Sequence, residues 1–363
     1  MKKISISQLF AIILLSTGLK NHVIVTPILI DTSGRDAWIS VIVGYAFALV
    51  FSLLLLYVSR NFQTVSLFEW LSSTYSQQLS KLIAILIVIY LLITGWITLK
   101  ETVMWTEETF LFNTPTFFII LLLLACSLYI SYGRLNVIAI CAGVLLPIVI
   151  LFGIFVALGT IPDKVYKLLT PVLVENGWHE VFHGAFIVFS SMIEIFIIII
   201  LQHQVRQSLK FKHLIILITF LSVLTVGPLI GSIAIFGVEE ASRIRYPSFF
   251  QWRIFGIGSY FNHLDFLSIY QWTSGNFIHL AIVLYLITEV FDIKKKKARI
   301  QIQVFICILY LLIILAPISN EDYLYFLSKY YYIISSILGV FIILCIALLI
   351  KLSKKRKSPH AEE

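Results

Sequence analysis

Two charged residues lie inside long apolar stretches of this sequence, where a charge is costly. Lys20 follows the polar run 16–18, and Glu194 comes shortly after Ser190 and Ser191. A charge at the centre of a membrane costs about 2.5–3.5 kcal/mol on insertion scales, so each residue must face protein or water and find a partner. We expect Lys20 and Glu194 to pair, either directly or through the charged groups of a bound amino acid. The alternative is a buried ion pair that fixes helix register and binds nothing.

Further polar side chains accompany these two charges. Ser190 and Ser191 precede Glu194 by four and three residues, which places all three on one helix face. A third polar stripe, at residues 270–274, could line a cavity or pack against another helix. We therefore expect a ligand-binding set of Thr17, Gly18, Lys20, Asn21, Ser190, Ser191, Glu194, Tyr270, Thr273 and Ser274.

One pattern typical of metalloproteases occurs, His179-Glu180-x-x-His183. On a helix its two imidazoles would lie one turn apart and could bind zinc, with the glutamate as general base. It stands at the start of a predicted span, and no third ligand is evident nearby, so a membrane zinc protease is only a remote alternative. The four cysteines have no metal-binding spacing. We expect no catalytic residue, no metal and no cofactor.

The elements that must position these residues are membrane spans. Of the 363 residues, 60% are hydrophobic and 13% are charged, and the mean hydropathy is +0.97. These values exclude a soluble enzyme, a nucleic-acid-binding module and a disordered protein. Apolar blocks of roughly 20 residues are long enough to cross a bilayer. They predict an all-α integral membrane protein with ten spans at 7–30, 37–58, 80–104, 116–133, 136–158, 181–202, 213–237, 264–290, 301–318 and 328–351.

Charge in the loops indicates the orientation. Of the 27 Lys and Arg residues, 18 fall on the side of both termini and 7 on the other side. The positive-inside rule then places both termini in the cytoplasm, including a basic tail at 352–363. The excess of basic residues therefore reports the membrane topology. We expect the lipid bilayer, and no nucleic acid, as the partner of these charges.

Ten spans divide into two halves of five, 7–158 and 181–351, within a single membrane domain. An odd number of spans in each half gives the halves opposite orientations, as in inverted-repeat transporters. Polar residues interrupt the first span of each half, at 16–22 and at 190–194. We predict that helices 1 and 6 are broken there, near the middle of the membrane, and that they form a central binding site.

The sequence resembles a known family, the B subunits of spore germinant receptors. This family is a branch of the amino acid–polyamine–organocation transporter superfamily. The resemblance covers nearly the whole chain. It is carried by short stretches in a fixed order, at 6–10, 36–40, 66–69, 170–172, 175–177, 184–185, 246–247 and 264–265, followed by Trp272 and Gly275.

The resemblance implies ten spans in the five-plus-five fold and a nutrient sensor in the inner membrane of spores. Such a subunit binds a small germinant, often an amino acid, and acts with an A subunit and a C subunit. Thr17, Gly18 and Asn21 correspond to the unwound part of the first helix, and Ser190 and Ser191 to the matching part of span 6. This sequence departs from the family at Met192-Ile193-Glu194, where proline and glycine are expected. The alternative is a proton- or sodium-coupled amino-acid transporter with the same site.

Overall fold

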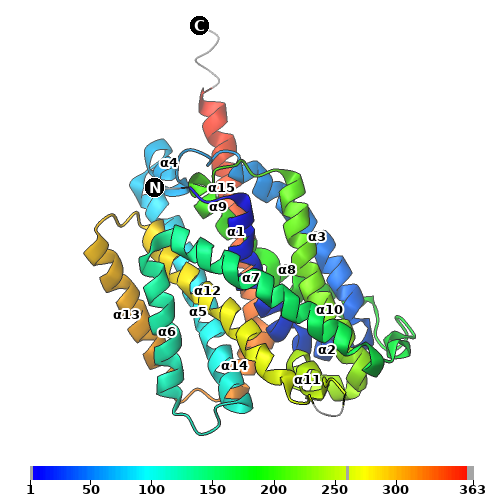
Figure 1. Cartoon of the computed structure of the whole chain (residues 1–363). Coiled ribbons are helices and arrows are strands. Elements are labelled where there is room, and N and C mark those ends of the chain that lie inside the picture. Colours follow the sequence, from blue (N-terminus) through cyan, green and yellow to red (C-terminus); the bar gives the residue numbers. More distant parts are fainter. Residues whose placement is uncertain (1–2, 259–260, 358–363) are drawn as a thin grey trace.

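The protein is a bundle of helices. The computed structural model describes residues 3–258 and 261–357 (Figure 1). The helices are α1 (Ile6–Ile13), α2 (Thr26–Ser33), α3 (Ala37–Ser59), α4 (Leu67–Thr74), α5 (Gln77–Thr109), α6 (Thr116–Tyr132), α7 (Arg134–Gly159), α8 (Trp178–Met192), α9 (Ile197–Leu201), α10 (Phe211–Arg243), α11 (Pro247–Ile254), α12 (Leu267–Val290), α13 (Lys296–Leu315), α14 (Asn320–Phe326) and α15 (Tyr332–Lys357).

Eight helical stretches of the described chain are long and apolar enough to cross a membrane. The first of them runs from Ile6 to Ser59, and its 54 residues turn at Gly34, whose φ of 52° suits glycine. A further apolar helix, α6, has 17 residues. Large apolar side chains such as Val50 and Leu122 are 69% and 66% exposed on the outside of the bundle. A surface this apolar belongs in lipid, so the predicted all-α membrane protein is confirmed.

The first helix begins where the sequence caps it. The Ser5 hydroxyl accepts a hydrogen bond from the Gln8 amide, and the Gln8 side chain accepts one from the Ser5 amide, at 3.2 and 2.9 Å. This reciprocal arrangement satisfies two N–H groups at the start of α1.

The expected break in helix 1 does not occur. The helix widens into two π-helical turns, Leu14–Gly18 and Asn21–Val25, with Lys20 between them, and then continues into α2. In a π-helical turn each N–H bonds the carbonyl five residues back. Widening therefore keeps the backbone hydrogen-bonded inside an apolar bundle, where an unwound segment would be costly.

The predicted break in span 6 does not occur either. The chain tightens from α8 into a 3₁₀ turn, Ile193–Phe196, and continues directly into α9. Neither proline nor glycine stands at 192–194, so nothing there forces the backbone out of a helical conformation. Both irregular segments nevertheless fall where the sequence placed the polar interruptions.

Small residues bring the first elements close to α8. A side chain at Gly184 would collide with Ser33 and Ser40, and one at Gly44 would come within 2.8 Å of the Ala185 carbonyl oxygen. Because lipid supplies no hydrophobic driving force between helices, this close approach of backbones is how membrane helices gain packing energy. It holds α8, and Glu194 beyond it, against α2 and α3.

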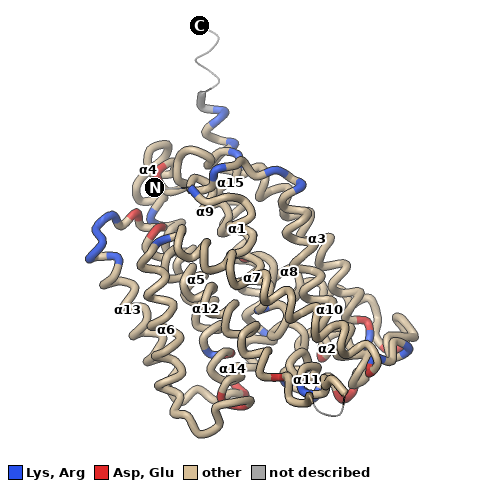
Figure 2. Tube along the Cα trace, in the orientation of Figure 1, with Lys and Arg blue, Asp and Glu red and all other residues tan. Residues whose placement is uncertain are grey.

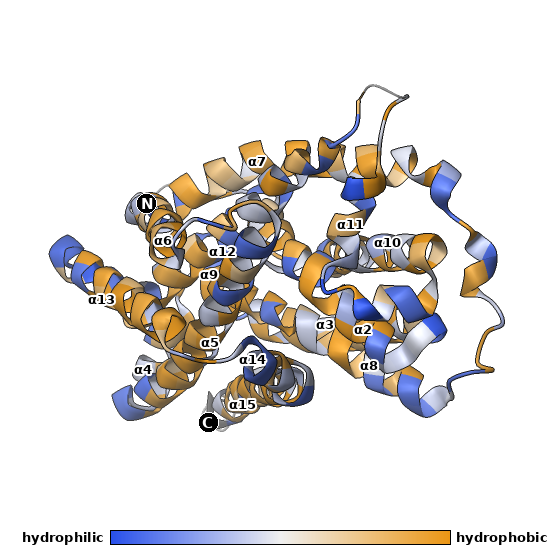
Figure 3. Ribbon diagram, turned by 90° about the horizontal axis from the view of Figure 1, so that it is seen from below, coloured by the Kyte–Doolittle hydropathy of each residue, from blue (hydrophilic) through white to orange (hydrophobic). Residues whose placement is uncertain are grey.

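Charged residues gather at the two ends of the bundle. Figure 2 shows many Lys and Arg residues at the end where α1 begins and α15 ends, and a mixture of both signs at the other end. Near the first of these ends Arg206 donates to the Lys3 carbonyl oxygen at 2.7 Å. Viewed along the bundle, the outer helices α6, α7 and α13 are largely apolar (Figure 3).

Candidate ligand-binding site

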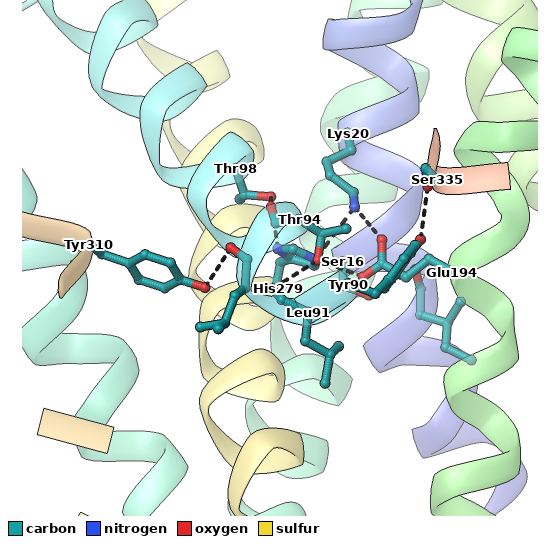
Figure 4. Close-up of polar contacts among 12 residues, drawn as sticks. Ser16, Lys20, Tyr90, Leu91, Thr94, Thr98, Glu194, His279, Tyr310 and Ser335 are labelled. Atoms are coloured by element: carbon teal, nitrogen blue, oxygen red, sulfur yellow. Dashed lines mark hydrogen bonds and ion pairs between the residues drawn. The ribbon is translucent and has the colours of Figure 1, made fainter. Parts of the chain in front are cut away.

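The central feature of the bundle is a buried ion pair. The Lys20 ammonium, between the two π-helical turns, binds the Glu194 carboxylate in the 3₁₀ turn (Figure 4). The two residues are only 7% and 1% exposed. The sequence left open whether the two residues pair directly or through a bound amino acid, and the structure shows the direct contact. At this burial the pair is stable only if both charges keep their partners, since an unpaired charge would cost several kcal/mol.

A histidine from α12 completes the group, and the sequence analysis missed it. His279 Nε2 lies 2.7 Å from Glu194 Oε1 and 3.4 Å from Lys20 Nζ, and the residue has no exposed surface. The signal was present in the sequence, because an ionisable residue inside an apolar span is a functional candidate by default. That criterion selected Lys20 and Glu194 and applies equally to His279.

Hydrogen bonding indicates which histidine nitrogen carries a proton. The ionised Glu194 carboxylate can only accept, so His279 Nε2 must donate to it. His279 Nδ1 lies 2.8 Å from the Thr98 hydroxyl oxygen, which is also 2.9 Å from the Thr94 carbonyl oxygen. Thr98 has one hydrogen, which it gives either to the imidazole or to Thr94. In the second case the imidazole is doubly protonated and positively charged.

A small cavity adjoins the ion pair. It measures about 20 Å³, room for roughly one water molecule. Three of the predicted site residues line it, Lys20, Asn21 and Ser191, together with Tyr331 and Tyr332 near the start of α15. Helix 1, α8 and the last helix thus meet at one enclosed point.

Two side chains on the first helix are buried without partners. Within the part of the chain that the structure describes, the Thr17 hydroxyl and both polar atoms of the Asn21 amide make no hydrogen bond. The residues are 0% and 1% exposed and stand one helical turn apart. A buried polar group without a partner costs about 1–3 kcal/mol. Asn21 lines the cavity, and such a cost there is typical of a site that a polar ligand completes.

The remaining predicted residues are distributed around this point. Ser190 donates to the Tyr332 carbonyl oxygen and joins α8 to α15, whereas Ser191 donates to Val188 at 2.6 Å. Gly18 packs against α10, since a Cβ there would lie 2.7 Å from Leu224.

The stripe on α12 lies apart from the ion pair. Tyr270 packs edge-on against Phe152 of α7, with ring centroids 5.7 Å apart. Thr273 donates to the Ile269 carbonyl oxygen of its own helix at 2.6 Å, and Ser274 is buried. No hydrogen bond or ion pair joins these three residues to Lys20 or Glu194 in the described chain. The part of α12 that reaches the centre is the next turn, with His279.

A second ion pair lies between the centre and the end of the bundle opposite Lys3. Glu101 on α5, with no exposed surface, binds Arg245 in the segment before α11. Burial is the largest single effect and lowers the pKa of Arg245, but Glu101, Tyr246, Tyr323 and Glu108 together raise it more, so the net pKa lies above its usual value. Tyr323 of α14 adjoins the same carboxylate.

A third polar group lies towards the end of the bundle where α1 begins. Glu289 at the end of α12 accepts hydrogen bonds from Gln204 at 2.6 Å and from Arg299 at 3.2 Å. The Tyr285 hydroxyl donates to Gln204 at 2.8 Å, and Arg299 lies over the Tyr285 ring. The central ion pair thus lies between two charge clusters, in each of which one partner is buried and the other is partly exposed.

The metalloprotease pattern has another role in the structure. The Glu180 carboxylate accepts from the Gly177 amide at 2.9 Å and so caps the start of α8, while the His179 side chain is 91% exposed. The described residues contain no group of three side chains suited to hold a metal ion. Helix capping accounts for Glu180 without zinc.

A helical bundle with an apolar exterior, a central ion pair and unpartnered polar groups beside an enclosed cavity defines a polytopic membrane protein with a candidate site for a small polar ligand. Residues 3–323 match the family described as spore germination protein. The chain is 37% identical over 352 residues to Spore germination protein XB of Bacillus anthracis, covering 96% of this chain and 98% of that protein. The chain therefore belongs to the spore germination protein family.

Proposed function

We propose that this chain is the nutrient-sensing subunit of a spore germinant receptor, with an amino acid as the germinant. The observation that carries the proposal is the pair of unpartnered side chains, Thr17 and Asn21, beside the Lys20–Glu194 ion pair. An amino acid offers a carboxylate to Lys20 and Asn21 and an ammonium to Glu194. It would replace one ion pair by two.

Ligand binding on this model changes the shape of the protein. A cavity of about 20 Å³ does not hold an amino acid, so Lys20 and Glu194 must separate to admit one. The closed bundle described here is then the resting state, and the germinant selects an opened state. Tyr331 and Tyr332 line the cavity from the last helix, so opening moves α15 relative to helix 1.

We place the chain in the inner membrane of the spore, with ten spans in two inverted halves and both termini in the cytoplasm. The long stretch Ile6–Ser59 supplies two of the spans, and α6 supplies the one that is shorter than the others. The π-helical turns that flank Lys20 and the 3₁₀ turn that contains Glu194 stand in the first span of each half, as an inverted repeat would place them. The opened state would be transmitted to the A and C subunits.

The test is thermal unfolding of the purified protein in detergent, with amino acids, sugars and nucleosides added singly. A germinant at 100 times its Kd should add about 2.7 kcal/mol to the stability of the folded state. Asn21→Leu should abolish this shift, because it removes both amide atoms at nearly the same volume. Stabilisation by a sugar or nucleoside alone would contradict the amino-acid assignment, and an unchanged shift in Asn21→Leu would contradict the site.

The second candidate is a proton- or sodium-coupled amino-acid transporter that uses the same site. It is favoured by the two charge clusters, Glu101 with Arg245 and Glu289 with Arg299, which lie on opposite sides of the central ion pair. Alternating access needs a closure on each side of the site. Uptake by reconstituted vesicles separates the candidates, since a transporter accumulates labelled amino acid whereas a receptor only binds it.

A further inference from the structure

A second polar pocket lies away from the central site, at the end of the bundle where α1 begins. It is formed where α6 turns into α7 and where α13 begins, and measures about 40 Å³. Figure 2 shows a Lys-rich segment at the start of α13, and Lys296 of this segment lines the pocket. Its polar and charged lining consists of Ser131, Tyr132, Arg134, Lys296, Arg299 and Gln303.

Three of these residues are cations, and one of them is buried. Arg299 is 9% exposed, and its Nη1 donates to Glu289 at 3.2 Å. Its Nη2 has no hydrogen-bond partner among residues 3–258 and 261–357. A buried guanidinium nitrogen in a cavity wall calls for an acceptor, and phosphate and carboxylate oxygens are the acceptors that arginine binds best.

The other two cations stand at the starts of helices. Arg134 is the first residue of α7 and Lys296 the first of α13, and neither helix start is capped by a side chain. The positive end of the helix dipole favours an anion at the start of α13. The Lys296 ammonium also lies 4.2 Å from the centre of the Tyr132 ring, which holds it at the pocket.

We propose that this pocket binds the phosphodiester group of an anionic phospholipid. The apolar surface beyond it favours a lipid over free phosphate. Tyr129 on α6, one turn before Tyr132 of the pocket, is 80% exposed. Its ring lies on the same side of α6 as Tyr132, on the membrane-facing surface, where acyl chains lie. A zwitterionic headgroup would bring an ammonium group next to the three cations.

The test uses the full-length protein in detergent, with short-chain phosphatidylglycerol, phosphatidylcholine and inorganic phosphate as probes. Native mass spectrometry and a binding titration report the affinity of each. The variant is Lys296→Gln, and the matched control is its neighbour Lys297→Gln, which removes the same charge from an exposed residue outside the pocket. Thermal unfolding without lipid shows that both variants are folded.

We expect phosphatidylglycerol to bind, and Lys296→Gln to weaken it about tenfold, the range of one charge-assisted hydrogen bond. Lys297→Gln should change the affinity less than about twofold, since detergent carries no anionic surface. Equal losses in the two variants would overturn the pocket, because attraction would then depend on net charge alone. Inorganic phosphate binding as tightly as the lipid, or phosphatidylcholine binding equally well, would overturn the lipid assignment.

Discussion

Lys20 and Glu194 are 174 residues apart in the chain and form an ion pair at the centre of the bundle. Each stands in a helical segment with irregular hydrogen bonding, a pair of π-helical turns for Lys20 and a 3₁₀ turn for Glu194. Irregular turns of this kind often mark functional hinges. The pair thus joins the two segments of the bundle whose backbones are easiest to rearrange.

The first prediction concerns the ion pair itself. Lys20→Met should lower the free energy of unfolding by about 3–5 kcal/mol, because it leaves the buried Glu194 carboxylate without its cation. Adding Glu194→Gln to Lys20→Met should recover most of the loss. Thermal or denaturant unfolding of the unmodified protein, the two single variants and the double variant measures the coupling free energy between the two charges. Additive losses in the double variant would mean that the two charges do not interact.

The second prediction concerns the unpartnered amide of Asn21. Asn21→Leu should stabilise the ligand-free protein by about 1–3 kcal/mol, because a buried amide without partners is replaced by an apolar group. The same variant should lose germinant binding. Ser222→Ala is the control, since Ser222 on α10 also has a buried hydroxyl without a partner in the described chain. It should leave binding unchanged, and destabilisation by Asn21→Leu would contradict the proposed site.

The third prediction concerns the support of His279. Thr98→Val keeps the volume but removes the hydroxyl that contacts His279 Nδ1, and should cost about 1 kcal/mol of stability. Thr102→Val is the matched control on the next turn of α5, because its hydroxyl bonds only the carbonyl of its own helix. Unfolding measurements compare the two. Equal losses would show that the contact with His279 contributes nothing.

The fourth prediction concerns closure by Glu101 and Arg245. In a chain whose native cysteines are replaced by alanine, the thiol of a Ser191→Cys variant should react slowly with a membrane-impermeant reagent. Arg245→Gln should accelerate the reaction about tenfold, if the closed state loses about 1.4 kcal/mol. Arg243→Gln, whose exposed partner is Glu239, should have little effect. Equal reaction rates in the Ser191→Cys protein and in its Arg245→Gln and Arg243→Gln derivatives would show that this ion pair does not close the site.

The sequence alone was sufficient for the class of protein and for the principal pair of charges. Long apolar blocks identify spans because a bilayer admits few backbone conformations. Lys20 and Glu194 stand out for the same reason, since a charge in such a block must find a partner. Capping of α1 by Ser5 and Gln8 is equally local and follows from neighbouring residues.

Only the tertiary structure determined the rest of the site. Whether polar residues break a helix or merely widen it depends on neighbouring helices, which here keep the backbone hydrogen-bonded through 16–25. His279 and Thr98 reach the ion pair because α5 and α12 pack together, and Tyr270 does not because its ring packs on α7. A periodic pattern shows that residues share a helix face, but the partner of that face is decided by packing between helices distant in sequence.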